Sequence, residues 1–243
     1  MRTKPAVLTI DIVTLFPSFF KGPLKESILK RAQQRGILKI RVHDLRDHTY
    51  DRHKTADDKP FGGGPGMVMK PEPIFECVES LKAKSKPEER PWTVLLEAKG
   101  ERLTQSLAAE LARKQRLILI AGHYEGVDGR VGDFLADQIL SIGDFVTMGG
   151  EAPALCVIEA VGRLVPGVLG NKDSLEQESF LSAGLEYPQY TRPRDYRGMK
   201  VPDVLVSGNH KEVLKWREEQ SRKMTRDRRP DLLEKESGGK KRF

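Results

Sequence analysis

Two strand-to-loop junctions constrain this 243-residue chain more than any other feature of its sequence. Residues 116–130 read RLILIAGHYEGVDGR, and residues 139–150 read ILSIGDFVTMGG. Each segment begins as a short apolar run that includes β-branched residues and then reaches glycine. Buried parallel strands that end in Gly-rich turns hold ligands in α/β proteins, because glycine tolerates positive φ and lets the backbone approach a ligand closely. We therefore expect a binding site where these two strands end.

The rest of the chain up to residue 165 alternates between strand and helix patterns. Strands are expected at 6–15, 38–44, 92–98, 116–121 and 139–147. Apolar residues at helical spacing predict helices at 23–35, 71–82, 103–114 and 152–165. This alternation predicts an α/β fold with a mostly parallel sheet and helices on both of its faces.

The C-terminal part of the chain differs from the first 165 residues in pattern and in charge. Residues 166–187 show weak periodicity and contain several turn-forming residues, so we expect them to be an interdomain linker. The linker would join a domain at 1–165 to a smaller domain at 188–243. In the smaller domain, a Gly-Asn-His turn precedes a helix with Val213, Leu214 and Trp216 on its apolar face. Residues 185–243 contain 16 Lys and Arg but 10 Asp and Glu, so they carry +6 of the net charge of +7. This excess favours a polyanionic partner such as a nucleic acid, although a solvated helix face with a loose tail would look the same.

The sequence predicts a cytoplasmic protein that does not enter a membrane. No stretch approaches the roughly 20 apolar residues of a membrane-spanning helix, and the N-terminus lacks the layout of a signal peptide. The two cysteines, Cys77 and Cys156, lie within helical apolar patterns. We expect both to be buried thiols in a reducing compartment.

Several charged side chains are candidates for chemistry. Glu125 and Arg130 flank the turn after the strand at 116–121, where the alternative is a surface ion pair. Arg163 lies within an otherwise apolar helical pattern, and its guanidinium needs an anion or a cluster of acceptors if it is buried. Three carboxylates follow in the expected linker, where the alternative is a solvated acidic loop: Asp173, Glu176 and Glu178.

A long polar loop at 46–70 contains the run GGGPG, which can bend the chain sharply and present backbone N–H groups to an anion. It lacks the Gly-Lys-Ser/Thr of a P-loop, and the chain lacks the G-x-G-x-x-G of a nicotinamide site. His43, His48 and His53 are five residues apart, which fits no zinc pattern. No Ser-His-Asp or Cys-His arrangement is apparent. The sequence therefore favours neither nucleotide hydrolysis nor zinc or triad chemistry.

Seven blocks in one order resemble the bacterial tRNA (guanine-N1)-methyltransferases of the SPOUT class. They include TLFPSFFKGPLKESILKRAQQRG, GGGPGMVMKPEP, AGHYEGVDGRV, SIGDFVTMGGEAPAL, EAVGRLVPGVLG, QYTRPRDYRG and VPDVLVSGNHKEVLKWR. The resemblance extends from about residue 8 to about residue 233. It implies a C-terminal trefoil knot in the sheet, an obligate homodimer and a small helical C-terminal domain that binds tRNA. It also implies S-adenosyl-L-methionine as methyl donor, with Mg2+ also required, and N1 of the guanosine immediately 3′ to the anticodon as the acceptor.

The resemblance also implies roles for individual residues. Glu178 would be the base that takes the N1 proton, Arg163 would stabilise charge on guanine O6, and Glu125 would be a further functional residue. The donor would be bound by Leu95, Leu96, Ala98, Gly100, Gly122, Tyr124, Glu125, Ile142, Gly143, Thr147, Gly149 and Gly150.

The chain departs from the family pattern at two of these positions. Glu178 stands where the family has an aspartate before Ser-Phe, and the two carboxyl groups have similar intrinsic pKa values near 4. Ala98 stands where the family has a proline that helps wall the adenine pocket. Two alternative functions are a ribose 2′-O-methyltransferase of the same fold class and a tRNA-binding protein without catalytic activity.

Overall fold

The computed structural model describes residues 8–170, 178–180 and 184–233. The chain divides into two compact units, Met1–Gly170 and Asn171–Phe243. Each is treated below by itself. The catalytic and tRNA-binding roles expected of the two domains stay predictions.

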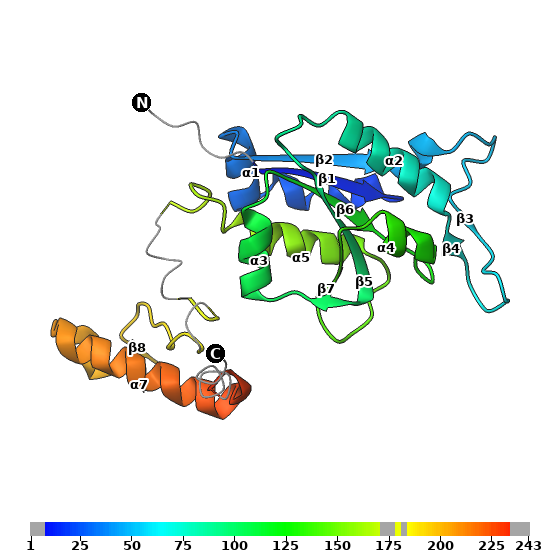
Figure 1. Cartoon of the computed structure of the whole chain (residues 1–243). Helices are drawn as coiled ribbons and strands as arrows, with labels where there is room; N and C mark the ends of the chain where they lie inside the picture. The colour runs from blue at the N-terminus through cyan, green and yellow to red at the C-terminus, as the bar shows by residue number, and fades with distance from the viewer. Residues whose placement is uncertain (1–7, 171–177, 181–183, 234–243) are drawn as a thin grey trace, which may run out of the picture. The chain divides into compact units, whose positions relative to one another are not determined.

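The first unit is built on a five-stranded parallel sheet in the order β2-β1-β6-β5-β7 (Figure 1). Its strands are β1 (Leu8–Thr14), β2 (Leu38–Asp44), β5 (Trp92–Arg102), β6 (Arg116–Ala121) and β7 (Gln138–Ser141). All six residues of β6 are buried, as expected for a parallel strand covered on both faces. The predicted mostly parallel α/β sheet is confirmed.

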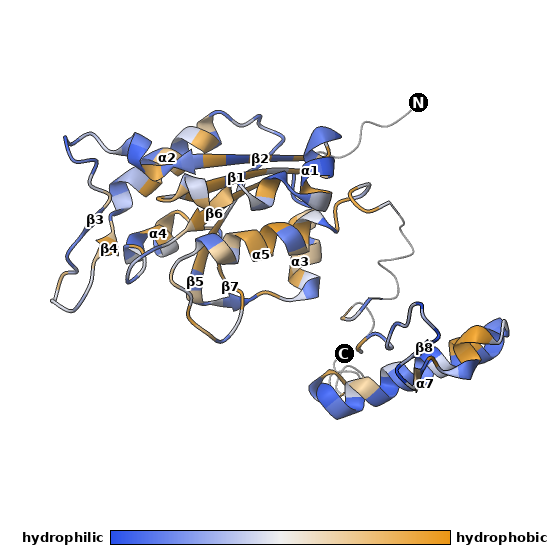
Figure 2. Cartoon of the chain, turned by 180° about the vertical axis from the view of Figure 1, so that it is seen from behind, coloured by the Kyte–Doolittle hydropathy of each residue, from blue (hydrophilic) through white to orange (hydrophobic). Residues whose placement is uncertain are grey.

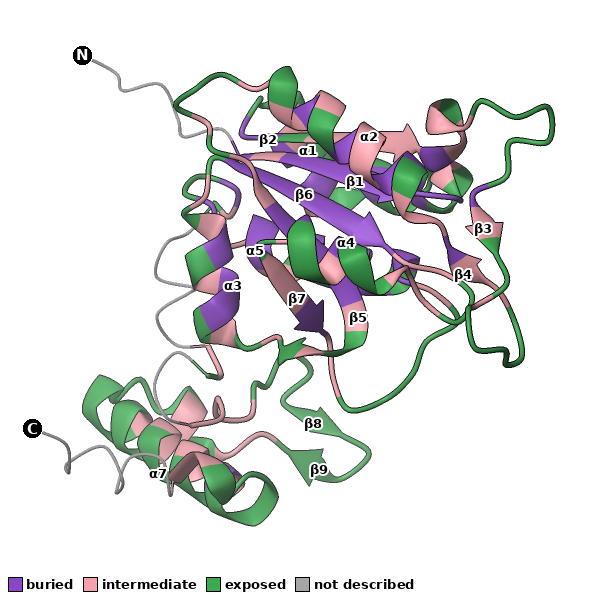
Figure 3. Ribbon diagram, turned by 45° about the vertical axis from the view of Figure 1, so that its right-hand side comes forward, coloured by how far each residue is buried: buried purple, intermediate pink, exposed green. Residues whose placement is uncertain are grey.

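Helices cover both faces of this sheet, and alternate residues of each strand enter different cores. Leu117 and Leu119 of β6 belong to the core on the face covered by α1 (Ser27–Gln34), α3 (Gln105–Ala112) and α5 (Glu151–Gly162). Ile118 and Ile120 belong to the core under α2 (Pro71–Ala83) and α4 (Gly129–Phe134). Buried residues follow the strands and the inner helix faces, and apolar residues concentrate in the same elements (Figures 2 and 3).

Short elements complete the first unit. They are the 3-10 helices η1 (Pro17–Phe20), η2 (Pro23–Lys25) and η3 (Leu45–His48) and the hairpin strands β3 (Asp57–Asp58) and β4 (Val68–Met69). The predicted helix 23–35 is divided between η2 and α1, because the backbone of Glu26 between them is extended. The six-residue helix α4 was not predicted, since its sequence GRVGDF is too short and glycine-rich to show a helical period.

Two predictions for the first unit are wrong. The strand expected at 139–147 ends at Ser141, whose hydroxyl donates to the Gly143 carbonyl at 2.9 Å and turns the chain into an exposed loop. Cys77 is buried, and burial raises the pKa of its thiol to about 12. Cys156, however, is exposed on α5, because the buried side of this helix is formed by Val157, Ile158 and Val161 instead.

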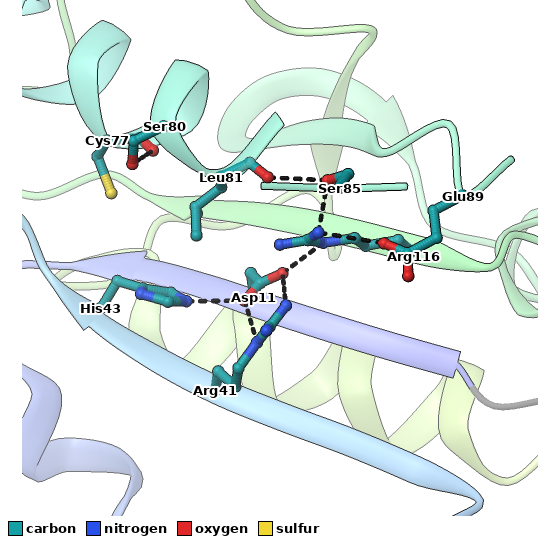
Figure 4. Close-up of polar contacts among 9 residues, drawn as sticks. All are labelled: Asp11, Arg41, His43, Cys77, Ser80, Leu81, Ser85, Glu89 and Arg116. Carbon is teal, nitrogen blue, oxygen red and sulfur yellow. Dashed lines mark hydrogen bonds and ion pairs between the residues drawn. The ribbon is translucent and has the colours of Figure 1, made fainter. Parts of the chain in front are cut away.

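A buried charge cluster links β1, β2 and β6 (Figure 4). The Asp11 carboxylate is fully buried and accepts two hydrogen bonds from Arg41, at 2.7 and 2.8 Å, and one from Arg116 at 2.8 Å. The His43 Nε2 lies 2.7 Å from the same carboxylate. Arg116 is also buried and reaches Glu89 at 3.2 Å. Burial alone would raise the pKa of Asp11, but the bonds from His43 and Arg41 and the charge of Arg116 lower it from 3.8 to about 2.

The second unit contains little buried structure in its described residues. A hairpin of β8 (Asp195–Tyr196) and β9 (Met199–Lys200) is followed by the 3-10 helix η4 (Asp203–Val206) and by α7 (His210–Arg228). The Asn209 side chain caps α7 by accepting from the Glu212 backbone N–H at 3.4 Å, which agrees with the predicted Gly-Asn-His turn and helix. Among residues 178–180 and 184–233, Thr225 alone is fully buried.

None of the helices in the described ranges is long and apolar enough to span a membrane.

Replacing Asp11 tests the buried charge cluster. Asp11→Asn should lower the free energy of unfolding by about 3–5 kcal/mol at pH 7, because it leaves the buried Arg116 guanidinium without its main counter-charge. The stabilising effect of a carboxylate with a lowered pKa is present above the unfolded-state value and is lost as pH falls through the folded-state value. The difference in free energy of unfolding between wild type and Asp11→Asn should therefore decrease as the pH is lowered from 4 to 2. Urea unfolding measures this difference. The exposed Asp58→Asn is the control, and equal stabilities of the two variants would contradict the account.

Candidate active site

A cavity of about 260 Å3 opens where β6 and β7 end, beside the register shift in β5. Its walls come from three segments of the first unit: residues 95–99, residues 122–127 and residues 140–150, joined by Pro153 of α5. The carboxyl ends of parallel strands meet at one edge of a sheet, which is where open α/β sheets bind ligands. The site expected from the two strand-to-loop junctions therefore exists as a cavity.

Backbone contacts fasten the loop 142–150 to the end of β6. The Gly150 N–H donates to the Gly122 carbonyl at 2.6 Å, and residues His123 and Gly149 form an antiparallel bridge. The Thr147 hydroxyl donates to the Gly149 carbonyl at 2.8 Å. The loop that covers the cavity is thus held mainly through main-chain groups at its C-terminal end.

This close approach requires glycine at the junction of the loop and α5. A Cβ on Gly150 would lie 2.7 Å from the Ala121 Cα and 2.8 Å from the Gly122 nitrogen. A Cβ on Gly149 would overlap the His123 ring and the Glu151 carboxylate. Because the obstacles at Gly150 are backbone atoms, no side-chain rotation can relieve the overlap there.

The glycine-rich loop 46–70 contributes the other side of the 122–127 segment. The Glu125 N–H donates to the Met67 carbonyl at 3.0 Å, and the Met69 N–H donates to the Gly126 carbonyl at 3.0 Å. A Cβ on Gly66, which has a φ of 77°, would lie 2.5 Å from the Glu125 side chain. The loop therefore ends as a short strand that positions Glu125 at the cavity. Anion binding by the three consecutive glycines of this loop stays a prediction.

A buried carboxylate lies directly behind the cavity. Glu151, the first residue of α5, is 4% exposed and accepts a hydrogen bond from the Thr14 hydroxyl at the end of β1, at 2.8 Å. Its other oxygen lies 3.4 Å from Nδ1 of His123, a residue that lines the cavity. The Phe16 ring packs against His123 with ring centroids 4.6 Å apart. This arrangement holds the His123 ring from two sides.

Several charged side chains border the cavity. Glu97 and Glu125 line it, together with Lys99, which pairs with Glu97 at 2.9 Å. Two carboxylates suit a ligand that carries positive charge or hydroxyl groups. Arg130 does not pair with Glu125, so that alternative is wrong. Arg130 instead makes a bidentate pair with Asp128, at 2.7 and 2.8 Å, and its hydrogen bonds lower the pKa of that carboxyl group.

This one cavity is lined by most of the residues that are expected to bind the methyl donor. Gly100 and Gly143 are the exceptions. A Cβ on Gly100 would lie 2.5 Å from the Leu140 nitrogen, so this glycine permits the register shift between β5 and β7. The lining residues among those expected are Leu95, Leu96, Ala98, Gly122, Tyr124, Glu125, Ile142, Thr147, Gly149 and Gly150.

The two other catalytic candidates belong to different units. Arg163 is half-buried and caps the C-terminal end of α5, so it lies one residue beyond the helix rather than inside it as expected. Glu178, in the second unit, is half-buried and precedes a segment attached to α7. There Ser221 donates to the Leu185 carbonyl at 2.6 Å and Thr225 accepts from the Leu185 N–H at 2.8 Å. Asp173 and Glu176, the alternative linker carboxylates, lie outside the described residues.

Sequence reasoning did not predict Glu97, Glu151 or Thr14 as part of this region. Thr14 ends β1, and parallel neighbours such as β1 and β6 end at the same edge of the sheet, so its position carried a signal. Glu151 follows two glycines at the start of an apolar helix, where a buried carboxylate needs a partner. Glu97 follows three buried apolar residues of β5 at the point where burial decreases.

Comparisons with known proteins identify relatives over nearly the whole chain. The family model described as tRNA (Guanine-1)-methyltransferase TrmD matches residues 8–235. A tRNA (guanine-N(1)-)-methyltransferase of Dictyoglomus turgidum is 56% identical over 231 residues, which are 95% of this chain and 92% of that protein. Proteins of the same name from Geobacillus kaustophilus and Carboxydothermus hydrogenoformans are 54% and 53% identical over 93% of this chain, and the matches cover 92% and 87% of those proteins.

Adding one methyl group at Gly150 tests whether the methyl donor expected from the sequence binds here. Gly150→Ala should push the loop 142–150 away from β6 and weaken binding of S-adenosylmethionine by at least about tenfold in calorimetry. Gly22→Ala is the matched control, because Gly22 has a similar φ of −77° and nothing within 4 Å of its added Cβ. A folded Gly150→Ala protein with unchanged affinity would show that the donor binds elsewhere.

Proposed function

We infer that this chain, which belongs to the tRNA (guanine-1)-methyltransferase family, transfers a methyl group to N1 of a guanosine in tRNA. The observation that carries this inference is the family match over residues 8–235, which includes every segment that lines the cavity. The finer proposal is that S-adenosylmethionine is the donor and that the acceptor is the guanosine immediately 3′ to the anticodon.

The cavity has the chemistry that this donor needs. Its sulfonium and ammonium groups are cationic, and the wall contains the carboxylate of Glu125 as well as that of Glu97, which also pairs with Lys99. Backbone groups of residues 122–126 and 140–150 can bond the adenine and ribose, while Leu95, Leu96 and Ile142 supply apolar surface. When it is bound, the donor supplies an electrophilic methyl group.

A trefoil knot is proposed for the C-terminal part of the sheet. The sheet order supports it, because the chain passes from β6 across β5 to β7 and then returns to β6. On that return, the N-terminal end of α5 lies against the end of β6 through the bond between Gly150 and Gly122. A helix that returns beneath a loop of its own chain is how such a knot would form, an exception to the usual connection rules.

The chemistry depends on removing a proton from the acceptor. Guanine N1 carries a weakly acidic proton and is a poor nucleophile until that proton is removed. Glu178 would accept this proton as N1 forms its bond to the methyl carbon and the carbon–sulfur bond breaks. The Arg163 guanidinium would stabilise the negative charge that develops on O6. The acceptor base must leave the anticodon-loop stack to reach these groups.

A homodimer is proposed as the working form. Exposed apolar side chains around the cavity support it, because Phe145, Val146 and Met148 are 58%, 85% and 96% exposed. Large apolar patches of this kind commonly mark protein interfaces. In a dimer, a second copy would cover this loop and could complete each site.

Magnesium and a cytoplasmic location stay predictions. Within residues 8–170, 178–180 and 184–233, no three His, Cys, Asp or Glu side chains are grouped so that they could hold a metal ion. The described residues thus do not form a complete metal site, and none of the proposed steps passes through Mg2+.

Locating the transferred methyl group tests the proposed function. A tRNA transcript with guanosine immediately 3′ to the anticodon should be methylated at N1 of that base, and a transcript with adenosine there should not. Nuclease digestion followed by mass spectrometry identifies the product. A methyl group on a ribose 2′-hydroxyl would instead indicate a ribose 2′-O-methyltransferase. Binding of tRNA without any methyl transfer would indicate a tRNA-binding protein without catalytic activity.

Replacing Glu178 tests the proposed base. Glu178→Gln keeps the shape of the side chain but cannot accept the proton, so the single-turnover rate should fall by roughly 10²-fold or more. Affinities for tRNA and donor should change little, and higher pH should partly restore the rate because solvent can then take the proton.

Two further variants decide between the linker carboxylates. Glu178→Asp should be slower than wild type, because the backbone around residue 178 is placed for the longer side chain. A wild-type rate for Glu178→Gln, together with an inactive Asp173→Asn or Glu176→Gln, would transfer the role of base to that residue.

A further inference from the structure

The second unit contains a separate cavity of about 390 Å3. It lies between the segment 187–194, the residues around η4 and one side of α7, all within the described residues. Its volume falls in the range of about 300–1,000 Å3 that is usual for small-ligand sites. Val201, Leu205 and Val213 supply apolar wall on the side of η4 and α7.

Positive charge dominates the lining. Three arginines and no carboxylate border the cavity: Arg192, Arg194 and Arg217. Arg194 is neutralised by Asp203, with 2.8 Å between Nη2 and Oδ1. No described carboxylate pairs with Arg192 or Arg217, and the buried Nε of Arg217 has no acceptor. The cavity therefore offers two uncompensated guanidinium groups to an anion.

Aromatic side chains lie beside these guanidinium groups. The Arg217 guanidinium stacks over the Tyr187 ring, 4.7 Å from its centroid. Tyr190 is 49% exposed, and its ring centroid is 6.2 Å from that of Trp216, at an interplanar angle of 57°. The exposed Tyr190 ring therefore lines the same cavity as Arg192 and Arg217. Aromatic rings and arginines together hold unstacked bases in proteins that bind single-stranded RNA.

We propose that this cavity binds one unstacked nucleotide of the tRNA, with its base against Tyr190 and its phosphate bonded by Arg192 and Arg217. The proposal rests on the proposed function, since it takes tRNA as the substrate. No carboxylate or histidine lines the cavity, so nothing there can take a proton from a base. The nucleotide held here is accordingly bound for positioning and is not the one that is methylated.

Matched variants of the full chain test the charge contribution. Arg192→Gln should weaken binding of an unmodified tRNA transcript by about tenfold, because it removes a phosphate contact inside the cavity. Arg222→Gln removes the same charge from an exposed position of α7 outside the cavity, and it should change affinity by less than about threefold. Arg192 is itself exposed and forms no ion pair with any residue of the described ranges, so its replacement should leave the fold intact, as circular dichroism can verify.

A second pair of variants tests stacking. Tyr190→Phe keeps the ring and should bind the transcript within about twofold of wild type, whereas Tyr190→Leu should lose about tenfold. Affinity for S-adenosylmethionine should be unchanged in all four variants. Equal binding by Arg192→Gln and Arg222→Gln, or by Tyr190→Phe and Tyr190→Leu, would overturn the proposal.

These measurements separate the cavity from the proposed function. If wild type binds the transcript but transfers no methyl group while the variants differ as expected, the proposed function fails and the cavity stands. If wild type methylates guanosine N1 and the paired variants bind alike, the cavity proposal fails and the function stands.

Discussion

The backbone contact between Gly150 and the end of β6 is the constraint on which the candidate active site depends. The hydrogen bond from the Gly150 N–H to the Gly122 carbonyl, at 2.6 Å, brings the start of α5 against the strand end. It places the loop 142–150 over the ends of β5 and β6 and so closes the cavity. Because the Ala121 and Gly122 backbone lies within 3.0 Å of any Cβ at residue 150, the approach exists only with glycine there. The same contact brings Glu151 into reach of Thr14 and His123.

The first unit contains two sets of polar groups, one that stabilises the fold and one that lies at the candidate ligand site. The Asp11 cluster lies under α2 and is closed by Arg41, Arg116 and His43. The pKa of its carboxyl group is lowered to about 2, so the carboxylate holds its charge at neutral pH. The groups at the strand ends include exposed ones, such as Glu125 and Tyr124, the latter with a φ of 60°. Strained or exposed residues of this kind are retained at sites where ligands bind. The sheet therefore holds its buried charges away from the edge that the ligand reaches.

Sequence patterns predicted the strand at 116–121 because a strand covered on both faces must be apolar throughout. They failed at 142–147, where Phe145 and Val146 favour a strand by propensity but are exposed beside the cavity. The pairing within the charge cluster had no sequence signal, since Asp11 and Arg116 are 105 residues apart. The bond between Thr14 and Glu151 could not be predicted either, because these residues are 137 apart. Cavity residues near glycine turns could be predicted because these turns mark the ends of strands. The side chains that contact and position those cavity residues come from elements distant in sequence, so they could not be predicted. The family resemblance, by contrast, supplied the reaction and the role proposed for Glu178, which spacing alone could not.

We propose that the edge of the sheet formed by β5, β6 and β7 binds the methyl donor. A crystal structure of the full chain with S-adenosylhomocysteine, the demethylated product, tests it most directly. We expect the adenosyl group between residues 95–98, 122–126 and 140–150, with hydrogen bonds from backbone groups and with Glu97 or Glu125 near its polar groups. Ligand density at any other place, with this cavity filled by solvent, would contradict the account.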